Sequence, residues 1–339
     1  MSSYSVMPGL GMPRQVSPRT TPLGWPGSVS RETSQRSDPL PPRAGDAKEQ
    51  TAGSEGLAAI AGRRRPGPVP RPGSTRVLVI ANQKGGVGKT TTAVNLAAAL
   101  ATRGLRVLLL DLDPQGNAST ALSVQHTEGT PSIYDVLIDS MPLSDVVVES
   151  KHVPGLYAGP ATLDLAGAEI ELVPLVSRET RLRGALSRYL HDEESAGRRI
   201  DYVFIDCPPS LGLLTVNALT AAAEMVIPIQ CEFYALEGLT ALMRTIEQVR
   251  LHLNPTLSVA AIVLTMFDAR TRLAADVAAE VRRHFGEQVL RTAVPRSVRI
   301  AEAPSFGQSV LTYDPGSAGA LAYLEVAADL TTPRREDVA

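Results

Sequence analysis

The segment at positions 82–91, Asn-Gln-Lys-Gly-Gly-Val-Gly-Lys-Thr-Thr, constrains this chain more than any other. The apolar run 77–81 before it is typical of a buried strand, and the Ala/Leu-rich residues 91–103 after it predict a helix that ends at Gly104. A glycine-rich loop between a strand and a helix can gather backbone N–H groups around a phosphate. The arrangement predicts a phosphate-binding loop, and a glycine-rich turn without a ligand is the alternative.

The side chains of this loop fit that prediction. Lys89 can reach the β- and γ-phosphates of a nucleotide, and the Thr90 hydroxyl can ligate Mg²⁺. The standard pattern has glycine where this chain has Gln83, and Lys84 follows directly. Only four lysines occur in the whole chain, and two are in this loop. The candidate nucleotide-binding residues here are Lys84, Gly85, Gly86, Val87, Gly88, Lys89, Thr90 and Thr91.

Carboxylates close two further apolar runs. Asp111 and Asp113 end the predicted strand 106–113, and Asp206 ends the strand 202–206. At the carboxyl ends of parallel strands these residues face the crevice where ligands bind, and Asp111 and Asp113 share one strand face because they are two apart. Next to Mg·ATP such carboxylates orient water or hold the metal's water shell. A strand-ending turn with aspartate as a cap is the alternative.

The remaining pattern alternates strands with helices. Further strands are predicted at 225–229 and 259–266, with 289–294 as a candidate sixth, and helices at about 211–223, 236–253, 271–285 and 317–330. This alternation predicts an α/β fold with a mostly parallel sheet flanked by helices on both faces. We interpret 76–339 as one such domain, in which 125–200 has the least distinct pattern.

Residues 1–75 differ sharply in composition. They hold 12 of the 26 prolines and carry 10 Lys/Arg against 5 Asp/Glu, whereas the rest of the chain is net acidic. A Pro-, Arg-, Gly- and Ser-rich segment without apolar periodicity buries too little surface to fold, so we expect 1–75 to be a disordered extension. It is either a solvated spacer or an arm that docks a further partner or tethers DNA.

Several classes of protein are disfavoured by composition. Two cysteines, Cys207 and Cys231, exclude a disulfide scaffold and fit a reducing cytosol. No charge-free apolar run reaches the roughly 18 residues of a membrane-spanning helix, and the first residues lack the pattern of a secretory signal. We therefore expect a cytoplasmic protein.

Together the motifs resemble the ParA/MinD family of deviant Walker ATPases, and in particular ParA/Soj-type partition ATPases. The resemblance includes the loop 82–90, the run 111–117 (Asp-Leu-Asp-Pro-Gln-Gly-Asn), the run 265–271 (Thr-Met-Phe-Asp-Ala-Arg-Thr), and the segment from Val294-Pro295-Arg296 to Ala301-Glu302-Ala303-Pro304-Ser305. The last two lie far from the loop in sequence. The resemblance therefore extends beyond a nucleotide motif and covers essentially all of 76–330.

The resemblance implies a role for each matching residue. Lys84 corresponds to the signature lysine, which reaches the nucleotide of a second subunit, and Gly85 to the position that must stay small for that approach. Asp113 corresponds to the aspartate that positions the attacking water, with Lys84, Lys89 and Asp113 as the catalytic set. Thr90 and Asp206 correspond to the residues at the metal, and Met266, Pro295 and Arg296 to the adenine side. Arg270 and Arg299 correspond to arginines that bind DNA without sequence preference; a solvated arginine face is the alternative.

The implied activity is slow, partner-stimulated ATP hydrolysis. An ATP-bound homodimer would bind double-stranded DNA on the nucleoid, and a ParB-type centromere-binding protein would stimulate hydrolysis and release. Other members of the family position a protein cargo or regulate division at a membrane. The C-terminal residues 330–339 contain Pro333 and acids instead of a basic amphipathic helix, so we expect no stable membrane association. An iron–sulfur protein that uses Cys207 and Cys231, or an ATP-dependent amide ligase, are the remaining alternatives on such a fold.

Overall fold

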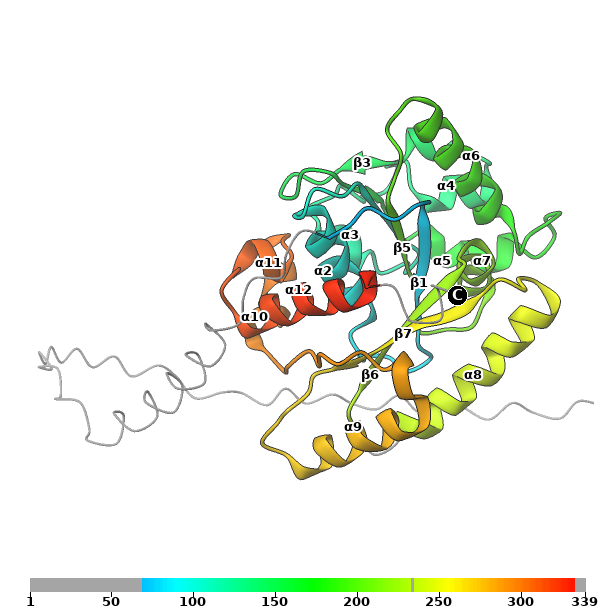
Figure 1. The fold of residues 1–339 in the computed structure, drawn as a ribbon. Helices are drawn as coiled ribbons and strands as arrows, with labels where there is room; N and C mark the ends of the chain where they lie inside the picture. The colour runs from blue at the N-terminus through cyan, green and yellow to red at the C-terminus, as the bar shows by residue number, and fades with distance from the viewer. Residues whose placement is uncertain (1–68, 233–234, 333–339) are drawn as a thin grey trace, which may run out of the picture. The chain divides into compact units, whose positions relative to one another are not determined.

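The computed structural model describes residues 69–232 and 235–332. They contain a seven-stranded sheet in the order β3-β4-β2-β5-β1-β6-β7 (Figure 1). The strands are β1 (Arg76–Ile80), β2 (Val107–Asp111), β3 (Val148–Glu149), β4 (Leu156–Gly159), β5 (Tyr202–Asp206), β6 (Glu224–Gln230) and β7 (Ser258–Thr265). All pair in parallel except β3, which is antiparallel to β4. The predicted α/β class is therefore confirmed.

The central strands are apolar on both faces because helices cover both. Every residue of β2 and β5 is buried, and the register pairs Asp111 with Asp206 and Ile80 with Asp206. This register brings the carboxyl ends of β1, β2 and β5 to one edge of the sheet. The phosphate loop and the acidic residues therefore meet at that edge, as expected for parallel strands.

Two hydrophobic cores lie on the two faces of the sheet. One core includes side chains from α2 (Lys89–Ala101), α3 (Asn117–Ala121), α11 (Val310–Tyr313) and α12 (Ala318–Thr331). The other includes side chains from α4 (Ile133–Ile138), α5 (Leu165–Glu171), α6 (Arg181–Ser195), α7 (Leu213–Ala221), α8 (Ala235–His252) and α9 (Arg272–Phe285). Short helical turns at Leu143–Asp145, Gly286–Gln288, α10 (Val298–Glu302) and Ala303–Phe306 complete the described elements.

Two sequence predictions about strands were wrong. The segment 289–294 is not a strand; it pairs with β7 at one isolated bridge, Ile262 with Val289, and a second isolated bridge joins Phe267 with Pro295 beyond the end of β7. Strand β2 ends at Asp111, two residues before the predicted end, so Asp113 lies in the turn that follows. The indistinct stretch 125–200 contains β3, β4 and three α-helices, and the shortness of β3, β4, α4 and α5 leaves little periodicity to detect. The predicted extension 1–75 lies outside the described residues up to position 68.

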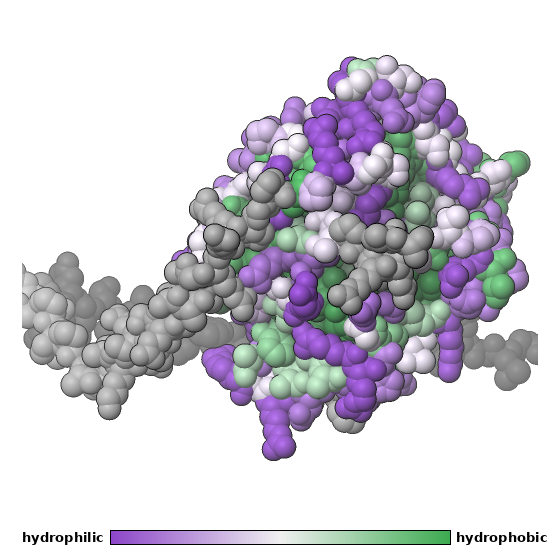
Figure 2. Space-filling view, in the orientation of Figure 1, coloured by the Kyte–Doolittle hydropathy of each residue, from purple (hydrophilic) through white to green (hydrophobic). Residues whose placement is uncertain are grey.

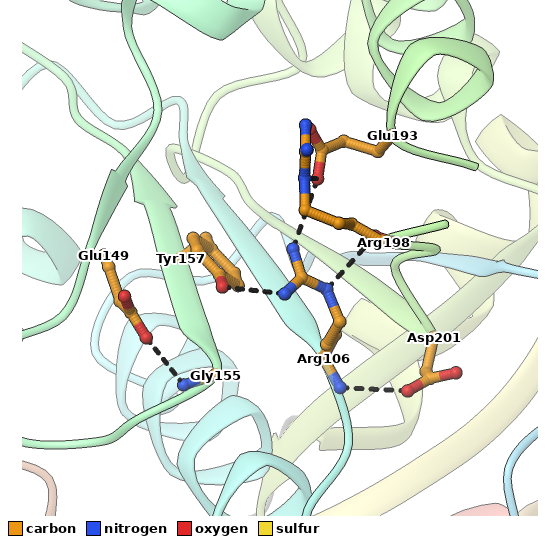
Figure 3. Close-up of polar contacts among 7 residues, drawn as sticks. All are labelled: Arg106, Glu149, Gly155, Tyr157, Glu193, Arg198 and Asp201. Carbon is orange, nitrogen blue, oxygen red and sulfur yellow. Dashed lines mark hydrogen bonds and ion pairs between the residues drawn. The ribbon is translucent and has the colours of Figure 1, made fainter. Parts of the chain in front are cut away.

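A polar network fixes the amino-terminal end of the sheet (Figure 3). The Arg106 side chain donates to Tyr157 Oη (2.9 Å) and to Glu193 (3.2 Å), and its backbone N–H donates to the buried Asp201 carboxylate (2.9 Å). Arg198 also pairs with Glu193 (2.7 Å). These contacts tie α6 to β2, β4 and β5, and a cavity of about 910 Å³ lies at the amino ends of β1, β6 and β7. This end of the sheet is opposite the phosphate loop, so this cavity is not the nucleotide site.

No helix among the described residues is long and apolar enough to cross a membrane.

Candidate nucleotide-binding site

The glycine-rich loop lies between β1 and α2, as predicted. Gly86 (φ 74°) and Gly88 (φ 86°) both adopt left-handed backbone conformations, which L-residues with a side chain rarely tolerate. Gly88 is the N-cap of α2, so the unpaired N–H groups of the first helical turn are available at the loop. Lys84, Gly85 and Gly86 are exposed, whereas Val87 is buried and anchors the loop.

Hydrogen bonds hold this loop in place. The Asn82 amide donates to the Pro228 carbonyl (2.8 Å) and accepts from the Lys84 N–H (3.1 Å). The Thr265 hydroxyl at the end of β7 donates to the Val87 carbonyl (2.8 Å). The loop is therefore fastened to β6 and β7 as well as to its own strand, and this rigidity favours a preformed phosphate site.

The two lysines of the loop have different environments. Lys89 is 7% exposed, and its ammonium contacts the Lys84 carbonyl (3.4 Å). Burial lowers the pKa of Lys89, while Asp206 and Asp113 favour its charged form. Lys84 is exposed and forms an ion pair with Glu232 (2.5 Å). Lys89 is thus directed into the site, and Lys84 lies on its outer surface.

Asp206 is the most unusual carboxylate in the described structure. It is fully buried at the end of β5, and among residues 69–232 and 235–332 no hydrogen bond of good geometry reaches either of its oxygens. Burial and, next, the charge of Asp111 raise its pKa well above the usual value, although the Thr90 hydroxyl lowers it. A buried carboxylate without a partner beside a hydroxyl is the donor set that a hard cation such as Mg²⁺ prefers. Thr90 and Asp206 therefore fit the predicted metal.

Asp111 and Asp113 have different hydrogen-bond partners and therefore different roles. Asp111 accepts hydrogen bonds from the Ser119 hydroxyl (2.7 Å) and N–H (2.9 Å), so it holds the first residues of α3, and burial raises its pKa to about 6. Asp113 accepts from the Gln115 N–H (3.0 Å), and its own N–H donates to Asp111 (3.2 Å). Strand β2 ends at Asp111, so the predicted shared strand face does not extend to Asp113. Asp111 stabilises the local structure, and Asp113 stays at the site, where its charge acts on Lys89.

The predicted adenine-side residues lie on two adjoining segments. The Phe267 N–H donates to the Val294 carbonyl (2.9 Å) and the Arg296 N–H to the Phe267 carbonyl (3.1 Å), which places Pro295 beside Phe267. Met266 has a left-handed backbone (φ 49°), and its Cε lies 3.9 Å from an ideal Cβ on Gly88. A cavity of about 340 Å³ adjoins the start of α2, and its lining includes Thr90, Thr91, Asn95, Pro304, Ser305 and Gln308. Met266, Pro295 and Arg296 do not line that cavity.

The predicted DNA-binding arginines are exposed but paired. Arg270 is 89% exposed and forms a two-point ion pair with Asp268 (3.0 and 2.9 Å). These bonds, with a smaller effect of Arg296, lower the pKa of Asp268 to about 2. Arg299 pairs with Glu302 (3.2 Å) and Asp314 (3.4 Å). Any phosphate would therefore compete with internal carboxylates at both positions.

Sequence reasoning missed several residues of this site. Thr265 could have been found, because a polar residue that closes an apolar strand at the ligand edge is a detectable signal. Ser119 holds Asp111, and Glu232 pairs with Lys84, but neither belongs to a pattern with a known spacing. Only the folded chain brings Glu232, 148 residues away, to Lys84.

The sheet order, the loop and the buried acidic residue define a P-loop nucleoside-triphosphatase fold. A family model described as an AAA domain matches residues 75–259. The chain is 50% identical over 255 residues to the sporulation initiation inhibitor protein Soj of Bacillus subtilis, which covers 75% of this chain and 98% of that protein. It is 53% identical over 261 residues to the chromosome partitioning protein ParA of Caulobacter vibrioides (77% and 96%). The chain belongs to the ParA/Soj family of partition ATPases.

Solved structures agree with this fold. The cobyrinic acid a,c-diamide synthase of Mycobacterium smegmatis, solved with ADP and magnesium, is 39% identical and matches with a TM-score of 0.63 over 75% of this chain and 92% of that one. The cell division ATPase MinD of Pyrococcus furiosus matches with a TM-score of 0.61 over 78% and 99%. At 24% identity, the MinD structure supports the fold alone.

Proposed function

We propose that this chain is an ATP-dependent partition ATPase that segregates a chromosome or plasmid. Mg·ATP occupies the loop 84–91, with Lys89 on the β- and γ-phosphates and the metal near Thr90 and Asp206. The buried, unpartnered carboxylate of Asp206 beside Thr90 carries this proposal, because such a group is costly to retain unless a cation completes it. The process is supported by the relative at 53% identity, which is named a chromosome partitioning protein.

The proposed cycle is a two-state switch. ATP brings two copies together, with Lys84 reaching the other copy's nucleotide and Gly85 allowing the approach. The exposed position of Lys84, and the open space around Gly85, where an ideal Cβ has no atom within 4 Å, support this arrangement. The ATP-bound dimer binds DNA on the nucleoid, and a ParB-type protein stimulates slow hydrolysis, which returns the ADP-bound chain to solution. The γ-phosphate supplies the difference in affinity that such a switch needs.

Asp113 is the proposed group that positions the attacking water. In Asp113→Ala we expect ATP binding to persist and turnover to fall about 100-fold or more, the scale on which proton-transfer and positioning groups contribute. Single-turnover hydrolysis with a parallel nucleotide-binding titration measures both. Asp192→Ala, an exposed aspartate on α6, is the matched control. Normal hydrolysis by Asp113→Ala would remove this role.

Arg270 is the proposed centre of DNA contact. Charge reversal in Arg270→Glu replaces an attraction to phosphate with a repulsion, so we expect DNA affinity to fall at least about tenfold and the salt slope to become shallower. ATP-dependent pairing of two copies should be unchanged. Arg250→Glu, an exposed arginine on α8 that lines the cavity at the opposite end of the sheet, is the control. Unaltered DNA binding by Arg270→Glu would exclude Arg270 from the contact.

The role of the ParB-type partner is tested by ATPase activity. We expect DNA together with the partner to raise turnover, and neither alone to do so fully. Full stimulation of ATP turnover in the absence of the partner would indicate that a different factor regulates hydrolysis.

An amide ligase is the second candidate, because the 39% identical structural neighbour is named a diamide synthase. A ligase would hydrolyse ATP only with a small carboxylic acid and an amine donor, and DNA would have no effect on its rate. ATP turnover measured with DNA and partner, against turnover with a carboxylate acceptor and ammonia or glutamine, separates the two.

A further inference from the structure

The helix that follows Asp113 begins without a side-chain cap. The Asp113 carbonyl accepts from the Gly116 N–H (2.9 Å), and Gly116, with φ 62°, is the N-cap of α3. The Gly116 carbonyl accepts in turn from the Thr120 N–H (2.9 Å) and from the Thr120 hydroxyl (3.0 Å). Because a glycine has no side chain with which to hold this turn, the turn depends on contacts from outside it.

His126, in the loop after α3, supplies such a contact. An ideal Cβ on Gly116 would lie 2.7 Å from His126 Cδ2 and 3.2 Å from its Nε2, so the ring packs directly against the glycine. The same ring contacts the Thr120 hydroxyl through Nε2 (3.2 Å) and the Val124 carbonyl through Nδ1 (2.8 Å). His126 therefore touches both residues that join the turn to α3, Gly116 and Thr120.

The acceptors around His126 require a hydrogen on each ring nitrogen. A carbonyl can only accept, so Nδ1 donates to Val124. The Thr120 hydroxyl has one hydrogen, which it donates to the Gly116 carbonyl, and its oxygen is left to accept from Nε2. All three hydrogen bonds form together only when the imidazole is protonated on both nitrogens. In the neutral ring, Nε2 and the Gly116 carbonyl compete for the single hydroxyl hydrogen.

The surroundings of His126 leave its protonation open to solvent. Among residues 69–232 and 235–332 no ion pair reaches the ring, and its hydrogen-bond partners are Thr120 and Val124. The titratable groups of the segments that contact this loop and turn are Asp111, Asp113, Glu128, Lys151, His152 and Asp164. The ring is half-buried, and Figure 2 shows mainly hydrophilic side chains over the region of β3, after which His152 contacts Ser123 of the same loop (3.4 Å). Histidine is the side chain that changes charge between about pH 5 and 8.

We propose that protonated His126 is a positioning residue for hydrolysis, because it holds the turn that presents Asp113. This inference rests on the proposed role of Asp113 and adds a residue outside the segments that carry the family resemblance. A displacement of about 1 Å at a reacting group costs up to about 100-fold in rate, so the turn must be held closely. The phosphate loop is fastened to β6 and β7 by other contacts, and nucleotide binding is therefore independent of His126.

The test compares His126→Ala and His126→Gln with the wild type, as full chains, in single-turnover hydrolysis of Mg·ATP between about pH 5.5 and 8. Near the acid end we expect His126→Ala to be about tenfold slower, the ratio that corresponds to one hydrogen bond from a charged group. Its affinity for the Mg²⁺ complex of a non-hydrolysable ATP analogue should be unchanged. Near pH 8 the ratio should shrink, because the wild-type ring is then neutral. His126→Gln cannot gain a proton, so its rate relative to His126→Ala should not vary with pH.

A second variant tests the link between the ring and the turn. Thr120→Val keeps the shape of the side chain but removes the hydroxyl, so its hydrolysis should also be slow. The double variant His126→Ala/Thr120→Val should be no slower than Thr120→Val alone, because both changes break the same chain of contacts. The matched control is His152→Gln, at an exposed histidine that contacts Ser123 and not the turn; its rate and pH profile should match the wild type.

The outcomes separate this inference from the proposed function. A rate ratio that stays constant with pH would show that the ring acts by packing alone and would overturn the proposal, as would additive losses in the double variant or a matching loss of nucleotide affinity. Unchanged hydrolysis by His126→Ala, with inactive Asp113→Ala, would overturn the role of His126 and leave the proposed function standing. Normal hydrolysis by Asp113→Ala would overturn the proposed role of that aspartate and this inference with it. A thermal melt checks that His126→Ala is folded, and His126→Gln decides the question if it is not.

Discussion

Lys89→Ala should lose nucleotide binding, with ATP affinity reduced about 100-fold, the ratio that corresponds to ~3 kcal/mol for hydrogen bonds to a charged group. The ammonium is the buried cation of the loop, and Asp206 and Asp113 favour its charged state. Without it, the phosphates would meet two carboxylates and no buried positive charge. Isothermal titration with the Mg²⁺ complex of a non-hydrolysable ATP analogue measures the loss.

Lys151→Ala is the matched control for this variant, because Lys151 is an exposed lysine between β3 and β4. It should bind the nucleotide as the wild type does. A thermal melt without nucleotide checks that Lys89→Ala is folded. Retained affinity in a folded Lys89→Ala protein would contradict the assignment of the loop as the phosphate site.

Asp206→Asn should stabilise the nucleotide-free protein and at the same time abolish Mg²⁺-dependent ATP hydrolysis. The raised pKa of Asp206 means that its charged form is disfavoured in the folded chain. An amide of the same shape removes the buried charge, and we expect the free energy of unfolding to rise by at least about 1 kcal/mol, or ~3 °C in Tm for a domain of this size. It also removes the anionic oxygens near the metal, so turnover should fall at least about 100-fold.

The pH dependence of stability gives an independent check. A carboxyl group whose folded-state pKa is raised binds more protons in the folded than in the unfolded chain, so stability is greatest at low pH and falls as pH rises from the unfolded pKa through the folded one. For Asp111, between 3.8 and about 6, the change corresponds to roughly 3 kcal/mol. Chemical denaturation of the nucleotide-free protein between pH 4.5 and 7.5 should show this decline, and it should be smaller in Asp206→Asn. Equal slopes would contradict the view that buried acids destabilise the site.

Asp192→Asn on α6 is the control for both measurements, since that aspartate is exposed. Its stability, pH slope and hydrolysis should match the wild type. If Asp206→Asn were less stable than the wild type without nucleotide, the Asp206 carboxylate would have a stabilising partner in the folded chain, and the prediction would be contradicted.

The sequence predicted the parts of this protein that follow from local chemistry. Glycines with left-handed backbones, an apolar run before them and an Ala-rich helix after them are strict requirements of one loop, so Gly86, Gly88 and Lys89 were found where expected. The strands β1, β2, β5, β6 and β7 were predicted because burial on both faces leaves continuous apolar runs. The P-loop fold and the family followed from them.

The features that were missed depend on contacts between distant residues. A two-residue strand such as β3 has no periodicity, and 289–294 resembles a strand because it packs against β7 without forming a ladder. Asp111 and Asp113 look alike in sequence, yet Ser119 makes one of them structural. The ion pairs of Lys84 with Glu232 and of Arg270 with Asp268 depend on side-chain placement that residue patterns do not encode.

The acidic residues around Lys89 have a consequence for the order of binding. Asp206 and Asp113 place two potential negative charges against a single buried ammonium. A triphosphate without a metal would add to this excess of negative charge and be repelled. A divalent cation would neutralise both the carboxylates and the phosphates. Nucleotide and magnesium should therefore enter as one complex, and a chelator should displace both together.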